Sequence, residues 1–140
     1  MLRSSLTRLR TGFVLAALLL GIRCGHYVRP SVAQATVGSY KLDQYATATL
    51  SDDNPKGTIQ VNEISPDLIS ITATGTSGKT KFTYTYPNVD VVLTGQNAFD
   101  QEMYTLLFKG KYLGQAGSDG ISRFIEIYPT PRITLRAVEY

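Results

Sequence analysis

The sequence has few residues of the types that hold metals, form disulfides or act as nucleophiles, with one cysteine and one histidine in 140 residues. Both of them, Cys24 and His26, lie in the first 35 residues. Residues 36–140 can therefore form no disulfide, no Ser-His-Asp triad and no Cys-His pair. Zinc and copper sites usually use histidine or cysteine ligands, so we expect no metal site and no cofactor. The stability of this part of the chain must come from its hydrophobic core.

The first 35 residues lack acidic side chains and follow the order of a secretory signal. Arg3, Arg8 and Arg10 precede an uncharged apolar run at 13–22, and an A-x-A sequence follows at 33–35. This order predicts a signal segment at 1–35, cleavage after Ala35 and a single domain at 36–140. A spanning helix needs about 20 apolar residues, so we expect no stable membrane span after processing. The protein is predicted to be exported, either secreted or periplasmic.

Two alternatives would leave the protein attached to a membrane. The apolar run could stay uncleaved as an N-terminal anchor. Cys24 follows that run and could be acylated, although Arg23 stands where lipoprotein signals have a small residue. Both alternatives stay open at this point.

The basic charge of the chain belongs to its N-terminal segment. Five of the 14 basic residues lie in residues 1–35, and none of the 11 acidic residues do. Residues 36–140 therefore carry 9 basic and 11 acidic residues, a net charge of −2. A nucleic-acid partner requires a basic surface, so we expect none.

Alternation of apolar and polar residues is the main pattern of residues 36–140. It predicts about eight short strands, separated by turn residues, and no helix. Such a pattern is typical of an all-β fold, either an antiparallel barrel of about eight strands or a two-sheet β-sandwich. The predicted strands are 40–50, 58–62, 69–74, 81–86, 89–93, 102–109, 121–128 and 132–140.

Turn-forming residues predict the connections between these strands. Residues 75–79 predict a hairpin, and residues 94–101 predict a loop with one helical turn started by Asn97. Residues 110–120 contain four glycines and predict a long, mobile loop. The inward faces of the first and seventh strands are predicted to consist of Tyr40, Leu42, Ala46, Ala48 and Leu50, and of Ile121, Ile125 and Ile127.

Carboxylates remain as candidates for cation binding or catalysis. Asp52, Asp53 and Asn54 could offer oxygens to calcium, but their spacing is not that of an EF-hand and a solvated turn also explains them. Two facing carboxylates would favour a hydrolase, although the sequence alone brings no two of them together. We therefore predict a protein that is not an enzyme and has no catalytic residue, with a carboxylate-based hydrolase as an alternative. The carboxylates on or beside predicted strands are Glu63, Asp90, Glu102 and Glu126.

The start of the predicted domain resembles a known family. Gly38-Ser39-Tyr40 resembles the G-x-W/Y opening of lipocalin-like (calycin) barrels, with tyrosine in place of the usual tryptophan. In that family the aromatic residue closes one end of the barrel, and an arginine on the last strand packs over it. Arg136 is the matching position here. The resemblance implies a closed barrel with an apolar cavity, and it carries over neither a ligand nor a catalytic residue.

The inward faces of the predicted strands supply the candidate binding site. We predict that a small apolar or aromatic ligand binds among Tyr40, Leu42, Tyr84, Leu106, Phe108 and Ile125, because a barrel of about eight strands can hold one small ligand. The alternative is that these side chains pack to native density and leave no cavity. The protein would then be an extracytoplasmic structural or protein-interaction module that uses its outer surface.

Overall fold

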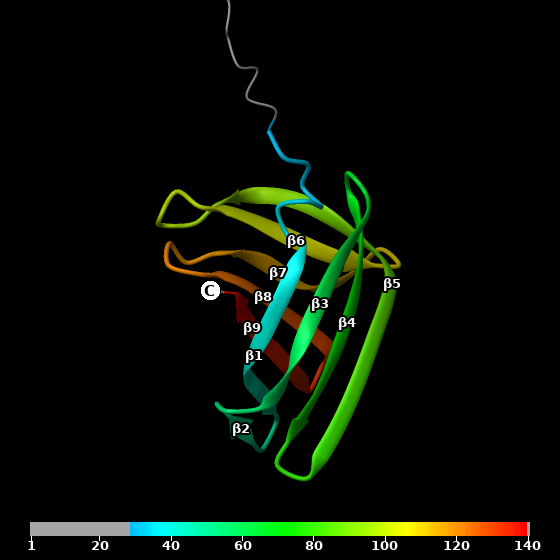
Figure 1. The fold of residues 1–140 in the computed structure, drawn as a ribbon, viewed down its shortest axis with the longest axis vertical. Helices are drawn as coiled ribbons and strands as arrows, with labels where there is room; N and C mark the ends of the chain where they lie inside the picture. Colours follow the sequence, from blue (N-terminus) through cyan, green and yellow to red (C-terminus); the bar gives the residue numbers. More distant parts are fainter. Residues whose placement is uncertain (1–28, 140) are drawn as a thin grey trace, which may run out of the picture.

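The computed structural model describes residues 29–139, and the basic N-terminal residues, the apolar run and Cys24 lie outside this range. Figure 1 shows the strands and the short segment that precedes them. The strands are β1 (Gly38–Thr47), β2 (Ser51–Asp52), β3 (Lys56–Ser65), β4 (Leu68–Ser77), β5 (Thr80–Gln96), β6 (Glu102–Phe108), β7 (Lys111–Ser118), β8 (Arg123–Thr130) and β9 (Ile133–Glu139). Among the described residues, no helix is long and apolar enough to cross a membrane.

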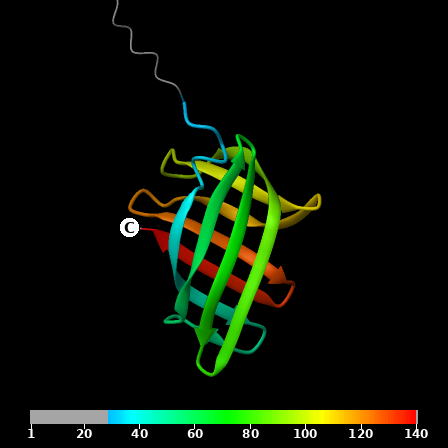
Figure 2. The same cartoon turned by 45° about the vertical axis from the view of Figure 1, so that its right-hand side comes forward.

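The strands close into a barrel. From β3 to β9 each strand pairs antiparallel with the next, β1 pairs with β3, and β9 returns to pair with β1. Strand β1 pairs with both neighbours: Gly38–Lys41 pair with β3, and Lys41–Thr47 pair with β9. The two-residue strand β2 is an addition beside β1. The predicted all-β fold is confirmed, and the alternatives resolve to a closed antiparallel barrel of eight strands rather than a sandwich (Figure 2).

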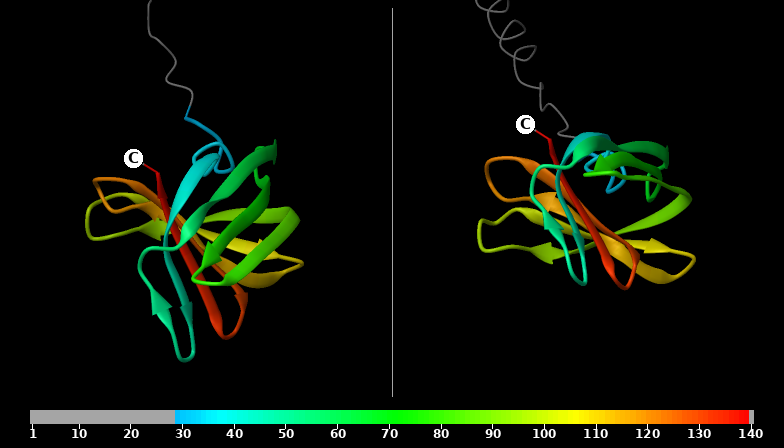
Figure 3. Two further views of the ribbon diagram at one scale, coloured as in Figure 1. Left: turned by 60° about the horizontal axis from the view of Figure 1, so that its bottom comes forward. Right: turned by 90° about the horizontal axis from the view of Figure 1, so that it is seen from below.

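The two ends of the barrel are built differently. We call one the plug end, because a turn at residues 31–37 lies there beside the β3–β4, β5–β6 and β7–β8 connections. The other is the hairpin end, which carries β2 and the tight β4–β5, β6–β7 and β8–β9 turns. In Figure 3 the barrel is turned so that this hairpin end comes forward, and the right-hand view looks at it from below.

One apolar core fills the space between the strands. Ile59, Val61, Ile69, Ile71 and Ala73 are fully buried, as the alternation in the sequence predicts for β3 and β4. The inward side chains of β6, β8 and β9 complete the same cluster, namely Tyr104, Leu106, Ile125, Ile127, Leu135 and Ala137.

Two predicted strands are in fact one. Strand β5 continues through Pro87 and Asn88, where its register on β4 shifts between the Ile71–Tyr86 and Ile69–Val89 pairs. A bulge residue needs no ladder hydrogen bond, so a proline is tolerated there. The break predicted at these two residues is therefore wrong, and it is a β-bulge in a continuous strand.

The predicted mobile loop at 110–120 is wrong, because most of it is β7. Gly110 and Gly120 lie in the flanking turns with positive φ, whereas Gly114 lies within the strand. A Cβ atom at Gly114 would lie 2.0 Å from the carbonyl oxygen of Glu126 on β8. Glycine is needed here for close backbone approach, which the sequence pattern alone does not distinguish from a loop.

Three further expectations need correction. A bulge between Leu42 and Gln44 turns Tyr45 inward in place of Ala46, and β1 ends at Thr47, so Ala48 and Leu50 are exposed instead of buried. Ile121 is 92% exposed, because β8 begins after it. Asn97 starts no helix; its side chain accepts hydrogen bonds from the backbone N–H groups of Phe99 and Gln101 within a tight turn.

Candidate ligand-binding site

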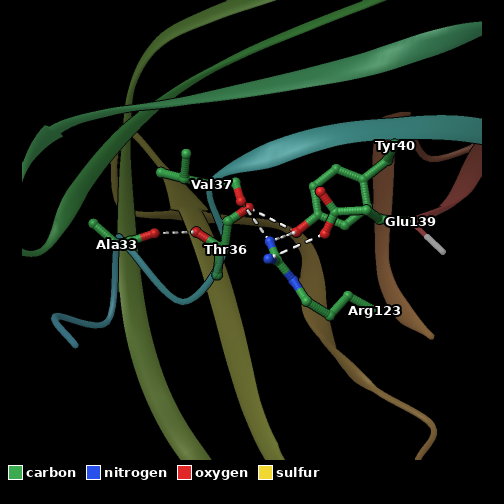
Figure 4. A network of polar contacts seen from close by, with 6 residues as sticks. All are labelled: Ala33, Thr36, Val37, Tyr40, Arg123 and Glu139. Carbon is green, nitrogen blue, oxygen red and sulfur yellow. Dashed lines mark hydrogen bonds and ion pairs between the residues drawn. The ribbon is translucent and has the colours of Figure 1, made fainter. Parts of the chain in front are cut away.

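Tyr40 closes the plug end of the barrel. Its side chain is buried, and its hydroxyl donates to the carbonyl of Thr36 at 2.7 Å and accepts from Arg123 at 2.7 Å. The Arg123 guanidinium lies over the Tyr40 ring, donates to the carbonyl of Val37 and pairs with Glu139 at 3.0 Å. Figure 4 shows this network at the start of β1. An aromatic side chain under an arginine therefore seals one end, as the resemblance implied.

The arginine that packs over Tyr40 is Arg123 and not Arg136, the residue that the resemblance implied. Arg136 lies over Phe124, 5.6 Å from the ring centroid, and pairs with Asp43. Its neighbours on β9, Leu135 and Ala137, point inward, so Arg136 points outward. Arg123 has the same parity as the inward Ile125 on β8, and that alternation is the signal that identifies it.

Aromatic side chains gather towards the hairpin end. Tyr45 of β1 stacks on Phe82 of β5 at 5.2 Å between ring centroids, and Phe82 lies 6.0 Å from Tyr84. Tyr86 of β5 meets Phe108 of β6 edge-on at 5.1 Å. Tyr45 and Phe82 are buried, whereas the other three are only partly buried although they pack against the core.

The strand pairing explains this partial exposure. Strand β5 pairs with β4 from Thr80 onward, but with β6 only from Val89 to Gln96. The first half of β5 therefore extends beyond the end of β6. Tyr84 and Tyr86 lie on this part, and the Tyr86 ring meets that of Phe108, the last residue of β6, which pairs with Val89. We call Tyr84, Tyr86 and Phe108 the aromatic mouth.

The six predicted site residues all lie in or against the one core cluster. Tyr40, Leu42, Leu106 and Ile125 are fully or almost fully buried, while Tyr84 and Phe108 belong to the mouth. The prediction missed Tyr86, which shares the inward face of Tyr84. It also missed Tyr45, because a bulge changes the parity of β1.

Hydroxyl groups in the mouth are free for other partners. The Tyr40, Tyr104 and Tyr128 hydroxyls donate to partners within the fold. Across residues 29–139, the hydroxyls of Tyr84 and Tyr86 make no such bond. Burial is the main cause that raises the pKa of both phenols, so they stay neutral hydrogen-bonding groups at ordinary pH.

Raised tyrosine pKa values predict a loss of stability in alkali. Burial raises the pKa of Tyr40 against the opposing effect of Arg123, and a hydrogen bond to Glu126 raises that of Tyr128. A pKa above the unfolded value of about 10 means that stability is intact below pH 10 and falls as pH rises through the folded pKa. Denaturant unfolding at pH 8, 10 and 11 should show that fall, with phenolate absorbance developing at higher pH in the folded than in the unfolded protein. Coincident phenolate titrations would contradict it.

A hollow lies at the plug end. It has a volume of about 400 Å³ and is lined by Ala35, Asp100, Gln101, Glu102, Tyr104, Gly117, Ser118 and Arg123. Glu102 pairs with Arg29 and accepts from the Tyr104 hydroxyl, while Arg123 is held by its contacts with Tyr40 and Glu139. Glu102 and Arg123 are thus already in ion pairs, although the buried Arg123 Nε has no hydrogen-bond partner among the described residues.

The carboxylates considered for catalysis stand apart in the strand ladders. Glu63 lies opposite Ile69, Asp90 opposite Leu107, and Glu126 opposite Gln115 and Arg136. Glu102 lies opposite Gln96. No two of the four are therefore cross-strand neighbours, and the ladders supply no catalytic pair.

The possible calcium ligands form a turn. Asp52 accepts from the Ser77 hydroxyl and the Asn54 backbone N–H, and these bonds lower its pKa. In the described part of the chain, no group of three or more histidine, cysteine, aspartate or glutamate residues is placed to hold a metal.

The architecture defines a class of protein. A closed barrel of eight antiparallel strands, each beside its neighbour in sequence, is the up-and-down barrel found in lipocalins. The lipocalin-like fold implied by Gly38-Ser39-Tyr40 is thus confirmed as an architecture. No protein-family model and no curated protein sequence matches the chain. Among solved structures, a point mutant of the fluorescent protein UnaG matches with a TM-score of 0.38 and 15% identity, over 74% of this chain and 94% of that one.

Proposed function

We propose that the barrel binds a small, largely apolar aromatic molecule at the aromatic mouth. The observation that carries the proposal is the partial exposure of Tyr84, Tyr86 and Phe108 on the inward side of the wall, at a point where β5 lacks its neighbour β6. Elsewhere the inward side chains of the barrel are mostly buried.

The chemistry of the mouth suits such a ligand. Aromatic rings prefer offset or edge-to-face neighbours with centroids about 4.5–7 Å apart, and the Tyr86–Phe108 pair already has that geometry. A flat ligand can extend the stack that Tyr45, Phe82 and Tyr84 begin. The Tyr84 and Tyr86 hydroxyls supply the few polar contacts that orient a ligand in an apolar site.

A neutral fluorescent probe, N-phenyl-1-naphthylamine, tests the proposal. It should bind the folded protein with enhanced emission. Tyr86→Ala and Phe108→Ala should each weaken binding about tenfold, which corresponds to roughly 1.4 kcal/mol and to the loss of one good aromatic contact. Fluorescence titration measures the affinity, and circular dichroism confirms that each variant is folded.

Tyr112→Ala is the matched control. Tyr112 is 56% exposed on β7, where it neighbours Tyr128 instead of the mouth. This variant should bind the probe as the unchanged protein does. A probe that ignores the protein, or that is weakened equally by all three substitutions, would refute the mouth as a site. The extracytoplasmic structural or interaction module would then be the better reading.

We further propose that the protein acts outside the cytoplasm and is not an enzyme. The basic residues and the apolar run at the N-terminus support export. The separation of the carboxylates in the strand ladders supports binding rather than hydrolysis.

A further inference from the structure

Residues 31–37 are built into the barrel. Ala33 is fully buried in the core cluster, and its N–H donates to the carbonyl of Pro66 at 3.0 Å. The Ala33 carbonyl in turn accepts from the Thr36 hydroxyl at 2.8 Å and from the backbone of Thr36 and Val37. The Ser31 hydroxyl donates to Glu63 on β3. These contacts join both sides of the A-x-A sequence, so a cut after Ala35 would remove part of the packed core.

The same end of the barrel carries exposed apolar side chains. Phe99 is 65% exposed in the β5–β6 connection, and Ile121 is 92% exposed in the β7–β8 connection. Ile64 and Leu93, near the ends of β3 and β5, are 50% and 40% exposed. Of the other large apolar side chains exposed in residues 29–139, Leu50 and Tyr112 belong to the hairpin end, and Val92 lies in the middle of the β5–β6 ladder.

Hydrogen bonds within the two connections hold Phe99 and Ile121 in exposed positions. The Asn97 side chain accepts from Phe99 N–H and donates to the carbonyl of Ser118, so it ties one connection to the other. Asp119 accepts from the N–H of Ile121. The loops lie side by side in Figures 1 and 2, and the segment at residues 29–37 enters at the same end.

The sequence before residue 29 indicates what faces this end. The apolar run at 13–22 is followed by residues 23–28, which can span at most about 20 Å when extended. An apolar run held in a bilayer, or an acyl chain on Cys24, would therefore keep the plug end close to the bilayer surface. Loop tips with exposed phenylalanine and isoleucine are suited to the membrane interface.

We propose that residues 31–35 stay on the mature protein and that its plug end docks on a zwitterionic lipid surface, with Phe99 and Ile121 in the interface. The three connections of this end carry Asp67, Asp100 and Asp119, whereas the basic Arg29 and Arg123 beside them are paired with Glu102 and Glu139. An anionic lipid surface would repel these carboxylates. The occupant is thus a bilayer of neutral headgroups, and the aromatic mouth near the other end stays accessible.

The absence of tryptophan makes a site-specific test possible. Single tryptophans are placed at the plug end by Phe99→Trp and Ile121→Trp, and at the hairpin end by Leu50→Trp and Tyr112→Trp. Each full-length variant is reconstituted with phosphatidylcholine vesicles whose acyl chains are brominated. Quenching at positions 99 and 121 should be at least about twofold stronger than at 50 and 112, with a blue-shifted emission, because side chains in the interface reach the brominated acyl chains and those at the hairpin end do not. Adding anionic lipid should reduce that quenching.

Equal quenching at the four positions, stronger quenching at 50 and 112, or no association with the vesicles would each overturn the docking. N-terminal sequencing of protein recovered from producing cells tests the retention step. A first residue at or before Ser31 agrees with the proposal, and any later first residue, such as Thr36, overturns it. Neither measurement involves the ligand probe, so the docking and the binding function succeed or fail separately.

Discussion

Replacing Tyr40 by alanine should lower the free energy of unfolding by about 3–5 kcal/mol, as for other large aromatic residues in protein cores. The side chain is 1% exposed and is among the largest fully buried groups of the barrel. Its loss leaves a cavity beneath Arg123 and removes the acceptor of one guanidinium N–H group. Denaturant unfolding followed by circular dichroism measures the change.

Tyr40→Phe separates the hydroxyl from the ring. This variant keeps the packing but leaves the carbonyl of Thr36 without its 2.7 Å hydrogen bond, which should cost about 1–3 kcal/mol. Tyr112→Ala serves as the surface control and should change stability by less than about 0.5 kcal/mol. A Tyr40→Ala protein as stable as the control would show that the ring does not close the barrel.

Much of the fold could be predicted because the alternation of apolar residues is regular where strands are regular. In the central parts of β3 and β4 every second residue is buried, as for Ile59, Val61, Ile69 and Ile71. Strict alternation specifies the register because a slip of one residue would turn the whole apolar face outward. The class of fold and most inward residues follow directly from this pattern.

Bulges account for several of the differences. One extra residue changes the parity of everything beyond it. The bulge in β1 brings Tyr45 inward, and the one in β5 carries the strand past Pro87. The period-two pattern does not locate such an insertion, because both parities remain plausible over a few residues. The candidate site was therefore only partly predictable: Tyr84 and Phe108 were found, and Tyr45 was not.

The arginine at the plug end shows a second limit of prediction from the sequence. The family resemblance predicts Arg136 at this place, whereas Arg123 packs over the Tyr40 ring. An arginine that packs over an inward tyrosine must itself point inward. The alternation along β8 and β9 therefore favours Arg123 over Arg136. At this position the alternation of inward and outward residues predicts the structure better than the family resemblance does.

Of the glycines in β7, Gly114 should tolerate substitution by a larger residue least. An added Cβ atom would lie 2.0 Å from the Glu126 carbonyl oxygen and 2.9 Å from the Ile127 Cα atom, both of them backbone atoms. Backbone atoms of a paired strand cannot move without breaking the β7–β8 ladder, which joins Gly114 to Ile127. Overpacking of this kind costs about 1–3 kcal/mol or more, so Gly114→Ala should lower the midpoint of denaturant unfolding strongly.

Gly117→Ala is the matched control, since it makes the same change three residues further along the same strand. The nearest obstacle there is the Met103 sulfur at 2.5 Å, at the end of a flexible side chain. Methionine can adopt another rotamer, so this variant should lose clearly less stability than Gly114→Ala. If residues 111–118 were a mobile loop, both positions would have room for a methyl group. Two equally small losses would then be seen, and that result would count against β7 as a strand of the barrel.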